Sequence, residues 1–168
     1  MRLTVSCLVI LAAFVTPAGA AAGERVIAGH GVRVRLPQDW KHVQAASPGP
    51  VTDPSTLLVV GSPGTQPRAS ECQIAAYRIP SDGAVVVIVG WKNIKLSGAQ
   101  SQTAGRWPLR HLIRVERPSF ECFSGRGAST ALVLEGKAYQ VNVLVGDGAT
   151  RERVSEALAV ARSFDVMG

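Results

Sequence analysis

Apolar and polar residues alternate with a period of two near the start of the chain, which is the pattern of a half-buried β-strand. In residues 32–36, valine and leucine alternate with arginine. This alternation predicts a strand with its aliphatic side chains inside and its arginines outside. The residues expected to face the core are Val32, Val34 and Leu36. A glycine-rich turn over 29–31 connects this strand to a second one predicted over 26–28.

Four further strands are predicted along the chain. Residues 84–90 are continuously apolar and mostly β-branched, which favours a central strand covered on both faces. Residues 57–60 and 73–79 are further candidates. Residues 109–117 also alternate, so we expect a strand there as well.

A β-hairpin is predicted over residues 131–145, where apolar residues alternate on both sides of a glycine. A two-residue turn at Gly136 and Lys137 puts glycine at the first central position, as a type II′ turn requires. In this register Leu134 lies opposite Tyr139.

The period changes to that of a helix after residue 150. Apolar residues recur at helical spacing over 151–163, and Thr150 is suited to cap the first turn. The apolar positions are Val154, Ala157, Leu158 and Ala161. We therefore predict the α+β class: an antiparallel β-sheet with a C-terminal amphipathic helix packed on one face.

Residues 1–22 have the three parts of a secretory signal peptide. Arg2 supplies the positive charge, residues 3–15 are apolar, and residues 18–20 are the small residues of a cleavage site. The apolar run is shorter than the roughly 20 residues that span a membrane. Cys7 lies too far upstream of the cleavage site for a lipoprotein. We therefore expect a secreted, extracytoplasmic protein with no transmembrane segment in its mature chain.

Removal of this leader leaves one predicted α+β domain over residues 23–168, of a usual size for a single domain. It contains two cysteines, Cys72 and Cys122. In an oxidising compartment such a pair is most simply read as one disulfide bond. A redox-active pair is the alternative, but the Cys-x-x-Cys spacing typical of that chemistry is absent.

No motif in the sequence identifies a catalytic, metal or cofactor site. The three histidines, His30, His42 and His111, share no ligand spacing with one another or with a cysteine. The sequence also lacks a nucleophile elbow and a phosphate-binding loop. We therefore expect no cofactor and no metal, and favour a non-catalytic protein over an enzyme.

The excess positive charge of the mature chain lies in residues 92–126, which carry a net charge of +5 while the remainder sums to zero. In the strand predicted over 109–117, alternation directs Arg110 and Arg114 outward. Arginine binds phosphate and carboxylate through two parallel hydrogen bonds. The candidate binding residues are Arg106, Trp107, Arg110, Arg114, Arg117 and Arg126.

This charge pattern favours an anionic cell-envelope component or an acidic protein as the partner. Nucleic acid is disfavoured, because the charge is modest and the expected compartment is extracytoplasmic. The alternative is that these arginines are solvated charges that maintain solubility and protect a sheet edge.

Two short motifs resemble those of PsbP-like domains. The segment Leu36-Pro37-Gln38-Asp39-Trp40 resembles their Pro-x-x-Trp opening, and Ala161-Arg162-Ser163-Phe164 resembles their closing helix. The cysteine spacing and closing hairpin also resemble secreted, uncharacterised actinobacterial proteins. The resemblance implies an α/β scaffold for protein interaction, and no functional residue is carried over from it. PsbP-like domains sandwich their sheet between helices, whereas only one helix is predicted here.

These observations favour a secreted, non-catalytic binding protein that engages an anionic envelope partner through a basic face. One alternative is a carrier or sensor for a small apolar ligand held between the sheet and the closing helix. Another is a hydrolase whose site is assembled only in the fold. Fold resemblance does not by itself decide among these functions.

Overall fold

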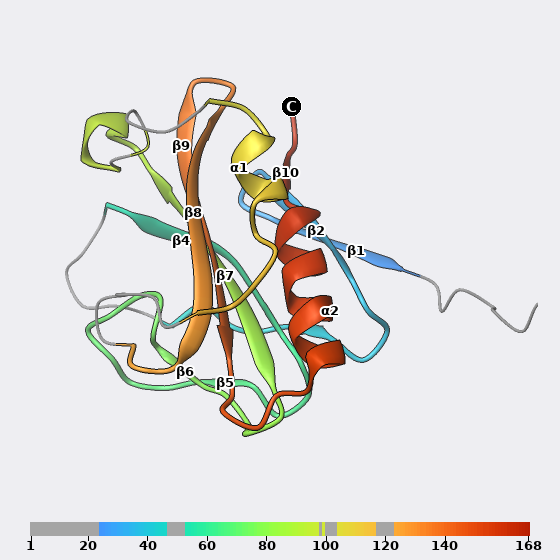
Figure 1. The fold of residues 1–168 in the computed structure, drawn as a ribbon. Helices are drawn as coiled ribbons and strands as arrows, with labels where there is room; N and C mark the ends of the chain where they lie inside the picture. Colours follow the sequence, from blue (N-terminus) through green and yellow to red (C-terminus); the bar gives the residue numbers. More distant parts are fainter. Residues whose placement is uncertain (1–23, 47–52, 98, 100–103, 117–122) are drawn as a thin grey trace, which may run out of the picture.

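The computed structural model describes residues 24–46, 53–97, 99, 104–116 and 123–168 (Figure 1). The predicted signal peptide over 1–22 lies outside these residues. The strands of the described chain are β1 (Arg25–Gly29), β2 (Val32–Leu36), β3 (Lys41–His42), β4 (Ser55–Gly61), β5 (Gln66–Pro67), β6 (Tyr77–Arg78), β7 (Ala84–Trp91), β8 (Arg126–Leu134), β9 (Lys137–Val145) and β10 (Asp165–Val166). The helices are a 3₁₀ turn (Ile94–Leu96), α1 (Trp107–Arg110) and α2 (Arg151–Arg162).

The described strands pair only in the antiparallel sense. The largest sheet has five strands in the order β3-β4-β7-β9-β8, a second has the order β1-β2-β10, and β5 pairs with β6. The fold is therefore mixed α+β with antiparallel sheets and a C-terminal helix, as predicted.

Strand β7 is the centre of the five-stranded sheet, which confirms the prediction from its apolar sequence. Every residue from Ala84 to Gly90 is buried. Ala84, Val86 and Ile88 belong to the core on one face, while the intervening valines belong to a second core on the other. A strand covered on both faces has no polar side, which accounts for its continuous run of β-branched residues.

Helix α2 and the β1–β2 hairpin cover the first face of the sheet (Figure 1). The helix begins as predicted, since Thr150 Oγ1 accepts a hydrogen bond of 3.2 Å from the Arg153 backbone N–H. Its buried residues are Ala157, Leu158, Val160 and Ala161, and Val154 is partly buried. Among the described residues, no helix is long and apolar enough to cross a bilayer.

Among the described residues, the second face is covered by irregular chain, the β5–β6 pair and the 3₁₀ turn, and not by an α-helix. Ala76 and Tyr77 are buried against this face, and Ile74 and Phe123 pack around them. The strand predicted over 73–79 is wrong except at β6. Strand β6 pairs only with β5, where Pro67 has no N–H with which to extend the ladder.

The β1–β2 hairpin is confirmed, with its alternation as predicted. Val32, Val34 and Leu36 are at most 1% exposed, whereas the arginines between them are exposed. His30 and Gly31 form the turn with φ values of 47° and 79°. Positive φ at both positions defines a type I′ turn, whose twist suits a two-residue hairpin.

The β8–β9 hairpin is also confirmed, but its turn lies one residue earlier than predicted. Leu134 pairs with Lys137 instead of Tyr139. The turn residues are Glu135 and Gly136, with φ values of 49° and 72°, which makes a type I′ turn in place of type II′. The predicted partner Tyr139 and the observed partner Lys137 are two residues apart on β9 and lie on the same face. Leu134 therefore keeps its predicted face of the sheet.

Candidate functional site

The segment that carries the candidate arginines is not a strand, so the prediction for 109–117 is wrong. Residues Trp107–Arg110 form the short helix α1, with Pro108 in its first turn. Proline is favoured there because its fixed φ is helical and its missing N–H is not needed. Leu109 and Leu112 are 2% and 3% exposed. One helical turn brings residues three apart to the same side, which places both leucines in the core.

Arg106 is held against the C-terminal end of the chain. Its guanidinium donates a hydrogen bond of 3.0 Å to the Phe164 carbonyl and forms an ion pair with Asp165. Arg33 of β2 binds the same carboxylate, with 2.7 Å between Nη2 and Oδ2. The hydrogen bond from Arg33 and the pairing with Arg106 lower the pKa of Asp165.

Asp165 therefore holds the start of α1 against β2. It is not among the site residues predicted above, because its partners are separated from it by 59 and 132 residues. No local pattern in a sequence reports a contact over such distances.

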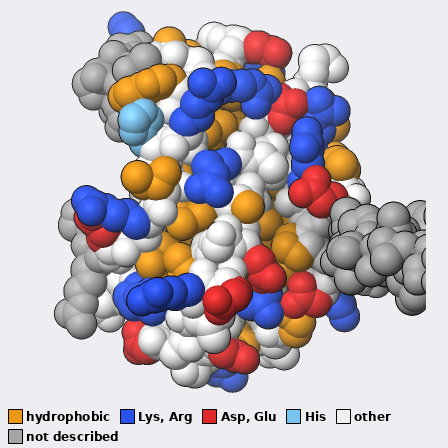
Figure 2. Space-filling view, turned by 45° about the vertical axis from the view of Figure 1, so that its right-hand side comes forward, with side chains coloured by type: hydrophobic (Ala, Val, Ile, Leu, Met, Phe, Trp, Pro, Cys, Tyr) orange, Lys and Arg blue, Asp and Glu red, His pale blue; other side chains and the backbone are white. Residues whose placement is uncertain are grey.

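The exposed side chains around α1 form a surface that we call the α1 patch. Its residues are Trp107, Arg110, His111, Ile113 and Arg114. Trp107 and Ile113 are 54% and 68% exposed, although both are large and apolar. The rings of Trp107 and His111 lie 3.8 Å apart between centroids, at an interplanar angle of 49°. Figure 2 shows Lys and Arg side chains gathered over the upper half of this side of the molecule, beside exposed hydrophobic side chains.

The two arginines of the α1 patch differ in their surroundings. Arg110 is exposed and its side chain has no hydrogen bond or ion pair within the described part of the chain. Arg114 Nε lies 2.6 Å from a carboxylate oxygen of Glu116, and both side chains are mostly exposed. Surface pairs of this kind are weak. Of the two arginines in the α1 patch, Arg110 is therefore the more available to an external anion.

Of the remaining candidate arginines, Arg106 is paired with Asp165, and Arg126 lies beside the chain that follows the α1 patch. Arg126 begins β8. Its neighbour Gly127 exchanges backbone hydrogen bonds of 2.6 and 2.7 Å with Glu116, the ion-pair partner of Arg114. Arg117 lies outside the described residues.

Only one of the two cysteines predicted to form a disulfide bond is among the described residues. Cys72 has an interaction partner, and Cys122 lies outside the described residues. The pairing of Cys72 with Cys122 therefore stays a prediction.

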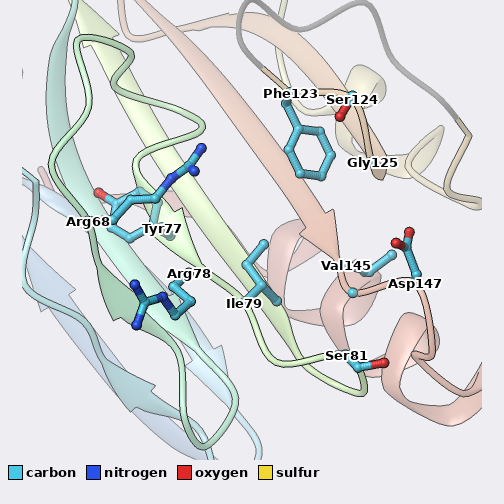
Figure 3. Close-up of a pocket in the computed structure, with 11 residues that line it drawn as sticks. Arg68, Tyr77, Arg78, Ile79, Ser81, Phe123, Ser124, Gly125, Val145 and Asp147 are labelled. Carbon is cyan, nitrogen blue, oxygen red and sulfur yellow. The ribbon is translucent and has the colours of Figure 1, made fainter.

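A groove of about 500 Å³ lies over the second face of the sheet. Arg68 and Tyr77 line one side of it, with Phe123 and Val145 on the other (Figure 3). Arg68 donates two hydrogen bonds to the Ala75 carbonyl, and the Tyr77 hydroxyl accepts one from a backbone N–H. Burial raises the pKa of Tyr77, so its hydroxyl stays protonated. These groups brace the loop that covers the sheet.

The three histidines lie on separate elements. His30 is in the β1–β2 turn, His42 is in β3 and His111 ends α1. Within the described ranges, no histidine side chain is hydrogen-bonded to a carboxylate or hydroxyl, and no group of three His, Cys, Asp or Glu residues could hold a metal ion.

Comparison with known proteins does not add a family to this picture. A scan against models of protein families finds no match, and a sequence search of curated proteins finds none either. The geometry of this chain is therefore what points to its function.

Proposed function

We propose that this protein is a secreted, non-catalytic binding protein that attaches to an anionic component of the cell envelope through the α1 patch. The carrying observation is the exposure of Trp107 and Ile113 directly beside Arg110. Large apolar side chains are normally withdrawn from water, and tryptophan is suited to an interface that is apolar on one side and wet on the other. Arginine adds attraction to phosphate and carboxylate groups.

The attachment of α1 to the rest of the fold supports a defined binding surface. Leu109 and Leu112 anchor the segment in the core, and Arg106 is tied to Asp165. The Arg162 guanidinium donates a hydrogen bond of 2.7 Å to the Leu112 carbonyl. A patch fixed in this way loses little conformational freedom on binding.

The proposal also includes a PsbP-like scaffold for this fold. It rests on the Pro37-to-Trp40 motif and the closing helix, with Trp40 fully buried beneath that helix. A binding role is in keeping with that resemblance and does not depend on it.

The test is co-sedimentation of residues 23–168 with vesicles and with purified cell-wall material over a range of salt concentrations. The vesicles are pure phosphatidylcholine or phosphatidylcholine mixed with phosphatidylglycerol. We expect binding to an anionic material that fades with salt, because the Debye length shrinks. Binding to neither anionic material at low salt would contradict the proposal.

The decisive variant is Arg110→Gln with Arg114→Gln. A cation near an anionic surface contributes about 1 kcal/mol, and Arg114 is already paired with Glu116. We therefore expect roughly tenfold weaker binding at low salt. The matched control is Arg78→Gln with Arg151→Gln, which removes the same charge from exposed sites on β6 and α2. Equal losses in the two variants would show that net charge, and not the α1 patch, is responsible.

A further inference from the structure

A second hollow of about 330 Å³ lies at one end of the five-stranded sheet, away from the groove in Figure 3. Its floor is a row of three paired residues, Ser55 on β4, Gly90 on β7 and Tyr139 on β9. The β1–β2 turn and the chain after β10 form its roof, where the Met167 N–H donates a 2.9 Å hydrogen bond to the Gly31 carbonyl. The volume is at the lower end of the range for small-molecule sites.

Gly90, at the floor, leaves room for the side chain of Leu57. Every other residue of the buried part of β7 is alanine, valine or isoleucine and fills one of the two cores. A Cβ atom added at Gly90 would lie 2.7 Å from Leu57 Cδ1, which lines the same hollow. A glycine inside a strand often marks the close approach of a ligand or of another chain segment.

The Tyr139 hydroxyl at the floor has no protein partner in the described part of the chain. Tyr139 is 6% exposed, with its ring packed on Phe164 at 5.3 Å between centroids. Its hydroxyl is not one of the enclosed unpaired oxygens, which among the described residues belong to Thr56 and Gln73. The hydroxyl is therefore accessible, and a water or a ligand can satisfy it.

The hydroxyl faces the hollow as a donor. Burial and the nearby charge of Glu135, which also lines the hollow, raise the pKa of Tyr139. The phenol therefore keeps its proton at neutral pH and can donate it in a hydrogen bond. Lys92 and Lys137 add two cationic donors to the lining, against the single negative charge of Glu135, so these charges favour an anion.

The rest of the lining is mainly apolar. The apolar wall residues on the face that carries Tyr139 are Leu57, Val166 and Met167. Met167 is 42% exposed, which is unusual for a large apolar side chain and provides further surface for a ligand to cover. Apolar walls with a few converging donors are typical of a site for a small ligand.

We propose that this hollow binds a small amphipathic carboxylate, such as an arylacetate or a medium-chain fatty acid. The carboxylate accepts hydrogen bonds from the Tyr139 hydroxyl and from a rim lysine, and the apolar body lies against Leu57 and Met167. This site is independent of the α1 patch, so each proposal can fail without the other.

The test is isothermal titration calorimetry of residues 23–168 with phenylacetate, indoleacetate and octanoate. We expect at least one of the three to bind with a Kd below about 1 mM. Phenylacetamide is the neutral match for phenylacetate and should bind at least tenfold more weakly, because it lacks the charge that the lysines recognise. Failure of all three acids, or equal binding of acid and amide, would overturn the proposal.

Variants locate the site. Tyr139→Phe removes only the hydroxyl and keeps the ring on Phe164, so it should weaken binding about tenfold without unfolding the protein. Gly90→Ala displaces Leu57 into the hollow and should also weaken binding. Lys41→Gln is the control, because exposed Lys41 pairs with Gly61, at the other end of β4 from Ser55. Unchanged affinity in Tyr139→Phe would place the ligand elsewhere and overturn the assignment.

Discussion

Asp165→Asn tests whether the chain end positions the loop before α1. The substitution keeps the size of the side chain and removes the charge that Arg33 and Arg106 share. The Asp165 side chain is 24% exposed, whereas the two arginines are about half exposed. Partly exposed ion pairs each contribute up to about 1 kcal/mol. The two pairs together therefore predict a loss of about 1–2 kcal/mol in the free energy of unfolding.

The pH dependence gives this prediction its sign. The hydrogen bond from Arg33 and the pairing with Arg106 lower the pKa of Asp165 below its ordinary value of 3.8. A carboxyl group whose pKa is lower in the folded state stabilises the fold above its unfolded pKa, and this stabilisation is lost as the pH falls through the folded pKa. The difference between wild type and Asp165→Asn should thus be full near pH 7 and shrink as the pH falls below 3.8 and through the lowered pKa of the folded state.

The assay is urea denaturation of both proteins over this pH range, followed by circular dichroism. In thermal denaturation, the same loss of about 1–2 kcal/mol corresponds to a fall of roughly 2–8 °C in Tm for a domain of this size. Glu71→Gln is the control, because Glu71 is exposed and belongs to no ion pair among the described residues. A stability difference that stays constant from neutral to acidic pH, or that equals the difference for Glu71→Gln, would refute this role of Asp165.

Two other predictions concern the core and the cysteines. Phe164→Ala removes a fully buried ring that packs on Tyr139, and chemical denaturation should show a loss of about 3–5 kcal/mol; a loss below about 1 kcal/mol would mean that the ring is not part of the core. Thiol titration of denatured, non-reduced residues 23–168 should find no free thiol if Cys72 and Cys122 are joined, whereas detection of both thiols would exclude the bond.

Much of the sheet was predictable because burial leaves a periodic trace in the sequence. Strand β7 is buried on both faces and is apolar throughout, while β2 is buried on one face and alternates. Helix α2 has the helical period and a capping Thr150. In each case, one element's own residues report which of its sides meets the core.

The fine register of the β8–β9 hairpin was not predictable in the same way. Both Glu135-Gly136 and Gly136-Lys137 place glycine at a suitable turn position, in type I′ and type II′ turns respectively. Glu135 adopts a positive φ that few residues other than glycine favour. Pairing along nine residues of each strand outweighs the local conformational cost at Glu135. A sequence pattern alone does not give the total energy of that pairing.

The candidate sites depend still more on tertiary contacts. The sequence identified α1 as a basic segment, but its alternation favoured a strand, and only the packing of Leu109 and Leu112 on the core makes it a helical turn. The hollow at Gly90 had one signal, a glycine at the end of a run of β-branched residues. Nothing local related it to Tyr139 or to the chain end that forms its roof.

The sequence by itself determined the α+β class, the central strand, the two hairpins and the amphipathic C-terminal helix, because each is written in the spacing of neighbouring residues. It also supplied the leader and the basic segment as predictions. Only the tertiary structure decided which arginines are held in ion pairs, which apolar side chains stay exposed, and where a hollow opens. These properties arise from contacts between residues far apart in the chain, and such contacts leave no periodic trace in the sequence.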